Sequence, residues 1–247
     1  MKISGSFHNQ ISIQEVALVG NWAAREEDLF RLATVVLTDE APQKKLPAAY
    51  LFGHTPDQQE SIISAGADLW LRRRVTYLFV CGGGPYYTPK DPARPLAYAG
   101  GIAWRDELVA RGVDRSDVIE LERPELSHTA TEAIKLIERA SEEGWQDAYI
   151  VTAPFHLLRA FASTVAAIND RYRNFRVWCR PGATLPWFDP VVTSQGKMAD
   201  SRIGEGMDME FDRLNRVYHN QWGLAPAGDC LNYLKRRHES AKAAGIL

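Results

Sequence analysis

The sequence is poor in cysteine and has no long hydrophobic run. Its three cysteines, Cys81, Cys179 and Cys230, are too few and too scattered for a disulfide framework or a zinc ribbon. No stretch approaches the roughly 20 apolar residues that span a bilayer. Met1 to Gln10 lacks the basic region and apolar run of a signal peptide. We therefore expect a cytoplasmic protein without membrane insertion.

An excess of charge of either sign is also absent. The chain carries 29 basic and 31 acidic residues, a formal net charge of -2. Composition therefore gives no electrostatic basis for binding nucleic acid or an anionic membrane. Two basic clusters, Arg72 to Arg74 and Lys235 to Arg237, lie where we expect helices to end, and cations there interact favourably with the helix dipole. We interpret both clusters as solvated helix ends.

What is present is a regular alternation of short apolar runs with longer segments of helical period. With 247 residues, 45% of them hydrophobic, the chain can bury a substantial core. Several runs lack polar alternation, which is typical of parallel strands covered on both faces. The alternation predicts a Rossmann-like α/β fold with a doubly wound, mainly parallel sheet. The expected strands are residues 48–52, 75–81, 118–121, 148–152 and 175–179, and the expected helices between them are 58–72, 96–111, 129–142 and 155–168.

The flanks of this pattern read differently from its centre. Residues 13–39 have helical character, a proline-marked loop follows at 181–190, and residues 200–222 and 229–240 again look helical. We predict three parts packed on one another. They are an N-terminal helical segment (1–46), the Rossmann-like core (47–180) and a small helical lobe (181–247).

Ligands of open α/β sheets bind beyond the carboxyl ends of the strands, so residues following the expected strands are candidates. Gly82, Gly83 and Gly84 follow the second strand. Glycines allow positive φ and close approach of an anion to backbone N–H groups, but a tight strand-to-loop turn accounts for them equally well. Neither a dinucleotide fingerprint nor a P-loop is present. The loop that follows, Tyr86 to Ala97, is long, and such loops tend to be functional.

The fourth expected strand ends in Thr152 and is followed by His156 and Arg159. Pro154 suits the first turn of a helix, whose free N–H groups could hold an anion. His156 and Arg159 are three residues apart and so share a helix face. A histidine can act as general acid or base near neutral pH, and an arginine can clamp a phosphate or carboxylate. The alternative is a histidine that caps the turn and a surface arginine.

Two further strand ends carry candidates. After the third strand, Ser127 or Thr129 could cap the next helix, with Glu132 as the partner in a capping box. That interpretation leaves His128 unexplained. After the first strand, Gly53 permits close approach of a ligand, and His54 is then another candidate.

Taken together, these motifs resemble the YdcF-like family, which includes the ElyC and SanA envelope proteins. The matching stretches are Leu51-Phe52-Gly53, Cys81-Gly82-Gly83, Ser127 to Ala133, and Glu210 to Arg213 with Tyr218 and Gly223. The best match, Val151 to Ala160, is similar to the family's V-T-x-x-x-H-x-x-R-A signature. The resemblance covers residues 47 to 236. It implies a Rossmann-like sheet with a smaller helical lobe, a cleft at the glycine turn and S-adenosylmethionine as a candidate ligand, but no general reaction.

The chain departs from the family pattern at two positions. Relatives carry an acidic motif opening the helix after the glycine loop, and this slot falls at Tyr98-Ala99-Gly100, where no acid stands. The family's Asn-Thr is replaced by His128-Thr129. If this acid is a catalytic base or metal ligand in relatives, we do not expect that role to be filled at this position here.

The leading hypothesis is a cytoplasmic hydrolase or transferase acting on a phosphorylated or nucleotide-like small molecule. Its catalytic candidates are His156 and His128. The rival is a non-catalytic protein that binds S-adenosylmethionine or another adenosine compound, and the third alternative is a scaffold with a vestigial pocket. No metal motif of recognised spacing is present, although His54, His128 and His156 could converge in space, and we expect no metal site. The sequence does not indicate an oligomeric state. The ligand-binding candidates are Gly53, His54, Gly82, Gly83, Gly84, Thr129, Glu132, Thr152 and Arg159.

Overall fold

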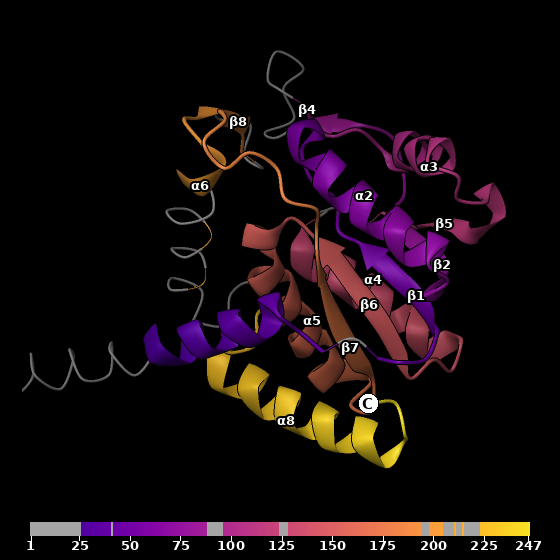
Figure 1. Ribbon diagram of the computed structural model, residues 1–247, viewed down its shortest axis with the longest axis vertical. Coiled ribbons are helices and arrows are strands. Elements are labelled where there is room, and N and C mark those ends of the chain that lie inside the picture. The colour runs from indigo at the N-terminus through magenta and orange to yellow at the C-terminus, as the bar shows by residue number, and fades with distance from the viewer. Residues whose placement is uncertain are drawn as a thin grey trace, which may run out of the picture.

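A five-stranded parallel sheet forms the centre of the molecule (Figure 1). The computed structural model describes residues 26–40, 42–87, 96–123, 128–193, 198–204, 210, 214 and 223–247. Every neighbouring pair of strands in the sheet is parallel, and the order is β5-β2-β1-β6-β7. The predicted Rossmann-like, doubly wound fold is confirmed. The strands are β1 (Leu46–Leu51), β2 (Val75–Cys81), β5 (Val118–Leu121), β6 (Asp147–Thr152) and β7 (Arg176–Pro181).

Helices cover both faces of the sheet, because successive side chains of a strand point to opposite sides. In β1, Ala49 and Leu51 pack toward α2 (Pro56–Leu71) and α3 (Gly101–Ala110). Ala48 and Tyr50 pack toward the other face. That face is covered by α4 (Thr129–Glu142), α5 (Leu157–Arg171), α8 (Ala227–Ala243) and the helix of residues 26–37.

Small elements connect these layers. The described residues include two short antiparallel ribbons, and single helical turns lie before β5, before α5 and after the second ribbon. They are β3 (Tyr86–Tyr87) with β4 (Leu96–Tyr98), β8 (Val191–Val192) with β9 (Met198–Ala199), η1 (Arg115–Asp117), η2 (Pro154–His156) and α6 (Arg202–Gly204).

The predicted helix at residues 96–111 is wrong at its beginning. Leu96–Tyr98 is β4, which pairs with β3, and the helix starts at Gly101. Gly100 has φ 96°, a left-handed conformation that ends the strand and precedes the first helical turn. The loop predicted at Tyr86 to Ala97 therefore begins and ends in a ribbon, and residues 88–95 lie outside the described part of the chain.

One of the two basic clusters was misplaced. Arg72 directly follows α2, as predicted, but Lys235 to Arg237 lies inside α8, which continues to Ala243. Arg237 is not solvated. It is 4% exposed, forms a bidentate ion pair with Asp39, and lies over the ring of Trp178.

Helices predicted in the two flanks are described only in part. Residues 26–37 form a helix within the predicted 13–39 segment, and α8 contains the predicted 229–240 helix. Most of 200–222 lies outside the described residues. Within the described ranges, no helix has both the length and the apolar character to cross a membrane.

Candidate functional site

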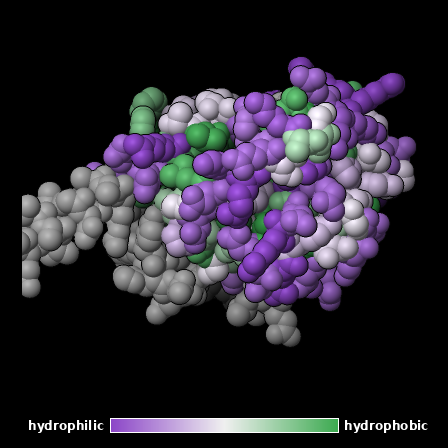
Figure 2. Space-filling model, turned by 90° about the horizontal axis from the view of Figure 1, so that it is seen from below, coloured by the Kyte–Doolittle hydropathy of each residue, from purple (hydrophilic) through white to green (hydrophobic). Residues whose placement is uncertain are grey.

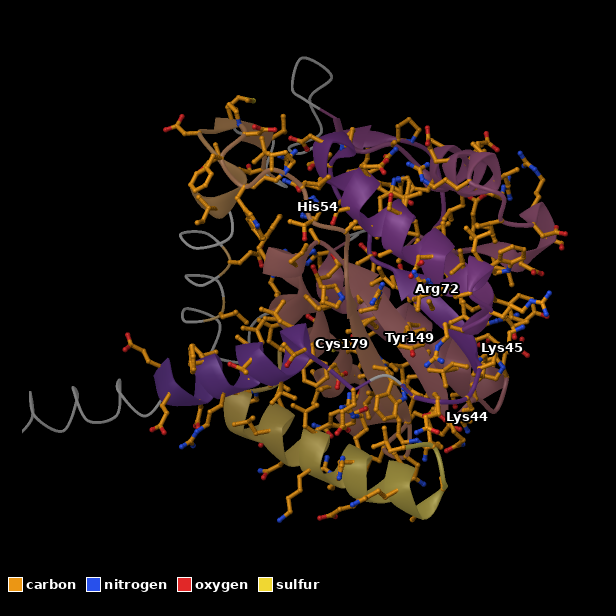
Figure 3. All side chains as sticks on the ribbon, in the orientation of Figure 1. Lys44, Lys45, His54, Arg72, Tyr149 and Cys179 are labelled. Atoms are coloured by element: carbon orange, nitrogen blue, oxygen red, sulfur yellow. The ribbon has the colours of Figure 1, made fainter. Side chains whose placement is uncertain are left out.

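The strand order reverses direction at β1, which has β2 on one side and β6 on the other. In open α/β sheets, ligands bind beyond the carboxyl ends of the strands at this switch point. Figure 3 shows His54 at this end of the sheet, with Lys44 and Lys45 at the opposite end. We use the name strand-end cluster for the polar residues gathered here, which are Tyr50, Gly53, His54, Thr129, Glu132, Thr152, His156, Arg159 and Glu210.

Glu132 lies at the centre of the strand-end cluster. It sits in the first turn of α4 and is 5% exposed. Its Oε2 accepts hydrogen bonds from Tyr50 Oη and from the backbone N of Gly53, both at 3.0 Å. The described residues give Oε1 no hydrogen bond. Burial raises the pKa of Glu132 to about 7, against the opposing effects of these two hydrogen bonds and of Arg159.

Tyr50 and Tyr98 fix the surroundings of this carboxyl. Burial and the neighbouring Glu132 raise the pKa of Tyr50 well above its ordinary value, so its hydroxyl stays a donor. The ring of Tyr98 lies against Gly53, where an added Cβ would meet Tyr98 Cε2 at 3.2 Å. Gly53 therefore both donates to Glu132 and leaves room for the Tyr98 ring.

A chain of hydrogen bonds links Arg159 to β6 through Thr129 and His156. Arg159 Nη1 donates to Thr129 Oγ1 at 2.5 Å, and this hydroxyl lies 3.1 Å from His156 Nε2. His156 Nδ1 lies 3.0 Å from Thr152 Oγ1. Because a guanidinium only donates, Thr129 keeps its own proton for Nε2, and the network assigns the imidazole proton to Nδ1. The predicted proximity of His156 and Arg159 thus arises through a shared threonine.

The fork of Arg159 is occupied by a carboxylate. Nε and Nη2 donate to Glu210 Oε2 and Oε1 at 2.5 and 3.0 Å, and the Glu210 side chain is only 3% exposed. Such bidentate pairs fix geometry as well as charge. Glu210 therefore occupies the guanidinium that was predicted to bind the anion of a ligand. This arrangement favours a positioning role for Arg159.

His54 is buried beside His156. The two ring centroids are 5.4 Å apart, and the ring of Phe155 is 5.6 Å from that of His54. The backbone N of Thr55 donates to His54 Nδ1 at 2.9 Å. Nδ1 is thus an acceptor, which places the proton of the neutral ring on Nε2.

His128, not Ser127 or Thr129, is the N-cap of α4. Its Nδ1 accepts from the backbone N of Thr131 at 3.4 Å, and the Thr131 hydroxyl accepts from the backbone N of His128 at 3.0 Å, completing a capping box. The capping interpretation was therefore wrong in its residues, and Glu132 is free of that task. Ser127 lies outside the described residues. Partial burial, and then Arg159, lower the pKa of His128, in keeping with an imidazole that accepts an amide proton.

Contacts within the protein explain why glycines stand in the turn after β2. Gly82 N donates to Leu121 O at 2.7 Å, and an added Cβ would lie 2.6 Å from that oxygen. Gly83 has φ 83° and accepts from Gly101 N. Only Gly84 has open space around a Cβ position. A tight turn accounts for the first two glycines, and ligand binding there stays a prediction.

Sequence reasoning missed two members of the strand-end cluster. Tyr50 gave no signal beyond its place in an apolar run, and Glu210 entered only through the family resemblance. Among the described residues, no three His, Cys, Asp or Glu side chains are grouped as metal ligands would be. Comparison of the chain with models of protein families and with curated proteins finds no match. Its likeness to the YdcF-like family stays a prediction drawn from the motifs.

Proposed function

We propose that this protein is an enzyme that transfers a proton to or from a small molecule held at the carboxyl ends of β1 and β6, with Glu132 as the general acid or base. The supporting observation is a buried carboxyl whose pKa is raised to about 7 and whose Oε1 has no hydrogen-bond partner among the described residues. A catalytic acid or base works best when its pKa lies near the working pH. Strongly perturbed pKa values gather at functional sites.

The surroundings of Glu132 suit this role. Tyr50 and Gly53 hold Oε2 in place, so the proton is carried by Oε1. Since a glutamate with a pKa of about 7 is half protonated at neutral pH, it can serve as acid in one step and as base in the next. The reaction classes that need such a group include hydrolysis and group transfer.

His156 and Arg159 then act as positioning residues. Both contact Thr129, the first residue of α4, three positions before Glu132. Together with Glu210, they tie the start of α4 to the start of α5 and so fix where Glu132 lies. This role replaces the proton transfer that the sequence suggested for His156, because both of its ring nitrogens face threonine hydroxyls.

For the substrate we propose a phosphorylated or nucleotide-like compound. Support comes from the exposed backbone at Gly83 and Gly84, which lies at the carboxyl end of the neighbouring strand β2, and from the resemblance to the YdcF-like family. The same resemblance supports a second candidate, a protein that binds S-adenosylmethionine without turnover.

The proposal is tested with Glu132→Gln, which keeps the shape and removes the titratable proton. Wild type and variant are assayed on a panel of phosphate esters and nucleotides, with binding of S-adenosylmethionine measured by calorimetry on the same samples. We expect turnover of at least one compound by the wild type, and a loss of roughly 10²- to 10⁴-fold in kcat in the variant, the usual contribution of general acid–base catalysis.

Glu138→Gln is the matched control, since Glu138 lies on the same helix and pairs with surface lysine and arginine side chains. It should leave kcat unchanged. Equal kcat for Glu132→Gln and wild type would contradict the role of Glu132. Saturable binding of S-adenosylmethionine with no turnover of any compound would favour the non-catalytic candidate.

A further inference from the structure

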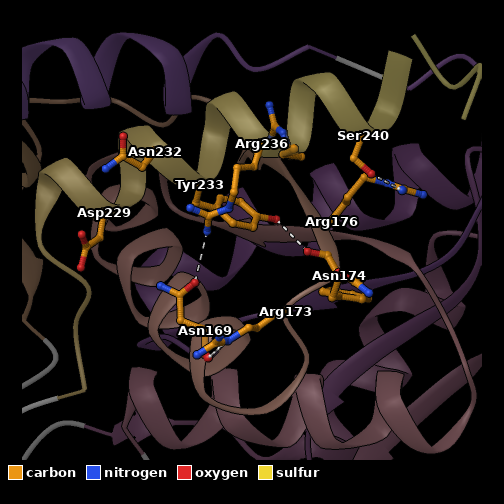
Figure 4. A pocket seen from close by; sticks show the side chains of 11 residues that line it. Asn169, Arg173, Asn174, Arg176, Asp229, Asn232, Tyr233, Arg236 and Ser240 are labelled. Carbon is orange, nitrogen blue, oxygen red and sulfur yellow. Dashed lines mark hydrogen bonds between the residues drawn. The ribbon is translucent and has the colours of Figure 1, made fainter. Parts of the chain in front are cut away.

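A groove of about 620 Å³ lies far from the strand-end cluster, between α8 and the end of α5. Figure 4 shows its lining: side chains on one face of α8 stand opposite Asn169 and Arg173, and the amino end of β7 forms the floor. No residue of the strand-end cluster lines it. Its volume lies in the range of small-molecule sites, about 300–1,000 Å³.

The lining of this groove carries positive charge that the chain does not neutralise. Arg176 and Arg237 are paired with the buried carboxylates of Asp147 and Asp39, which do not line the groove. Arg173 and Arg236 are exposed, and neither has a carboxylate partner in the part of the chain that the structure describes. The two unpaired arginines therefore share the groove with one lining carboxylate, Asp229.

The two unpaired guanidinium groups approach the same residue. Arg236 Nη2 donates to Asn169 Oδ1 at 3.4 Å, and Arg173 Nε donates to the Asn169 carbonyl at 3.2 Å. Like charges gathered in this way repel each other, and an anion between them relieves the repulsion. Their remaining N–H groups, in the planar fork of each guanidinium, match the oxygens of a phosphate.

Two further arginines of the lining carry guanidinium atoms outside their ion pairs. The Nε of Arg237, a side chain only 3% exposed, has no hydrogen-bond partner among the described residues. Arg176 Nη1 reaches out of its ion pair to Ser240 Oγ at 3.0 Å. The surrounding surface, seen from the side of α8, is mainly hydrophilic (Figure 2), which suits a polar ligand better than an apolar one.

We propose that this groove is a second small-molecule site, which binds a phosphorylated compound through Arg173 and Arg236. This site is independent of the proposed function of the strand-end cluster. The arginines supply forked donors to the phosphate oxygens, while Asn174 and Asn232, which also line the groove, offer amide groups to the remainder of the ligand.

The experiment uses inorganic pyrophosphate as the probe, titrated by calorimetry at constant ionic strength. We expect saturable binding to the wild type and a loss of roughly tenfold in affinity for each of Arg173→Gln and Arg236→Gln, the size of one charge-assisted hydrogen bond. The double variant should lose roughly a hundredfold in affinity at this groove, the product of the two single losses. Both side chains are exposed, so thermal unfolding of all variants should match the wild type.

Two controls distinguish binding in this groove from attraction to surface charge in general and from binding at the strand-end cluster. The double variant Arg31→Gln/Arg115→Gln removes the same charge from arginines that are 59% and 58% exposed elsewhere. Glu132→Gln alters the strand-end cluster. Both should bind pyrophosphate like the wild type.

Three results would overturn the proposal. The first is the absence of saturable binding to the wild type. The second is an equal loss in the Arg31/Arg115 variant, which would indicate surface charge alone. The third is a loss only in Glu132→Gln, which would assign the anion to the strand-end cluster instead.

Discussion

At the scale of single residues, the chemistry of this protein is concentrated in carboxylates that are kept from water. Glu132 is buried with its pKa raised, whereas Asp147 is buried and held by Arg176 and Trp178. The difference lies in their partners. Asp147 meets a guanidinium directly, while Glu132 meets a hydroxyl and an amide, and Arg159 acts on it only from a distance. Partners of this kind do not offset the cost of burying a charge.

This cost makes stability depend on pH. Below pH 4.5, the ordinary pKa of a glutamate, Glu132 is protonated in both the folded and the unfolded chain. As the pH rises to about 7, the unfolded chain releases the proton first, so the folded state loses stability through this interval. Above pH 7 the loss is complete, at about 3 kcal/mol. Glu132→Gln resembles the protonated form and does not titrate.

We therefore expect Glu132→Gln to match the wild type in free energy of unfolding at pH 4, and to exceed it by about 3 kcal/mol at pH 8. Urea unfolding at the two pH values, on wild type, Glu132→Gln and the surface control Glu138→Gln, measures the difference. A constant difference between wild type and Glu132→Gln at both pH values would mean that Glu132 titrates normally.

At the scale of elements, the strands and most helices could be predicted from the sequence, because apolar periodicity reports which face is covered. All five strands of the sheet and α4 appear where the pattern placed them, within two residues. The start of α3 could not be predicted, since it depends on Gly101 N reaching Gly83 O across the sheet end. The same holds for the N-cap of α4, where an imidazole takes the place usual for a hydroxyl.

The outer edge of β7 illustrates what periodicity misses. The backbone N of Val177 donates to Tyr233 Oη at 2.7 Å, and this hydroxyl donates to Phe175 O at 3.2 Å. The backbone N of Cys179 donates to Asp39 Oδ2 at 2.8 Å. Side chains thus bind edge groups that would otherwise be open to pairing with another strand.

Tyr233→Phe should lower the free energy of unfolding by about 1–3 kcal/mol, because it leaves the amide of Val177 buried without an acceptor. Hydrogen exchange at Val177 should become faster. Tyr172→Phe is the control, since its hydroxyl only accepts one bond from Gln146 at the surface, and it should change little. Equal effects of the two variants would contradict a special role for Tyr233 at the edge.

At the scale of the whole molecule, contacts between distant parts of the chain decide what the sequence could not indicate. The residues of the strand-end cluster come from β1, α4, α5 and residue 210. The sequence motif therefore identified Glu132 as a candidate, but it could not indicate that packing of these elements buries the carboxyl and raises its pKa. Likewise, Arg237 looked like a solvated helix end, although it pairs with Asp39, 198 residues away. Both corrections arise from burial, which depends on how the elements pack.

The Asp39–Arg237 pair joins the segment before β1 to α8. Each of the two side chains also forms a hydrogen bond with the backbone of β7. The two side chains are 0% and 3% exposed, and Arg237 also donates to Val177 O at 2.8 Å. Asp39→Asn would leave the guanidinium charge buried without its counter-ion. Breaking a buried pair in this way costs about 3–5 kcal/mol, so we expect a loss of that size in urea unfolding, with faster exchange at the Cys179 amide. Asp106→Asn, which removes the exposed Asp106–Arg115 pair, should cost less than about 1 kcal/mol. Equal losses of stability in the two variants would contradict a special contribution of the buried Asp39–Arg237 pair to the packing of α8 on the segment before β1.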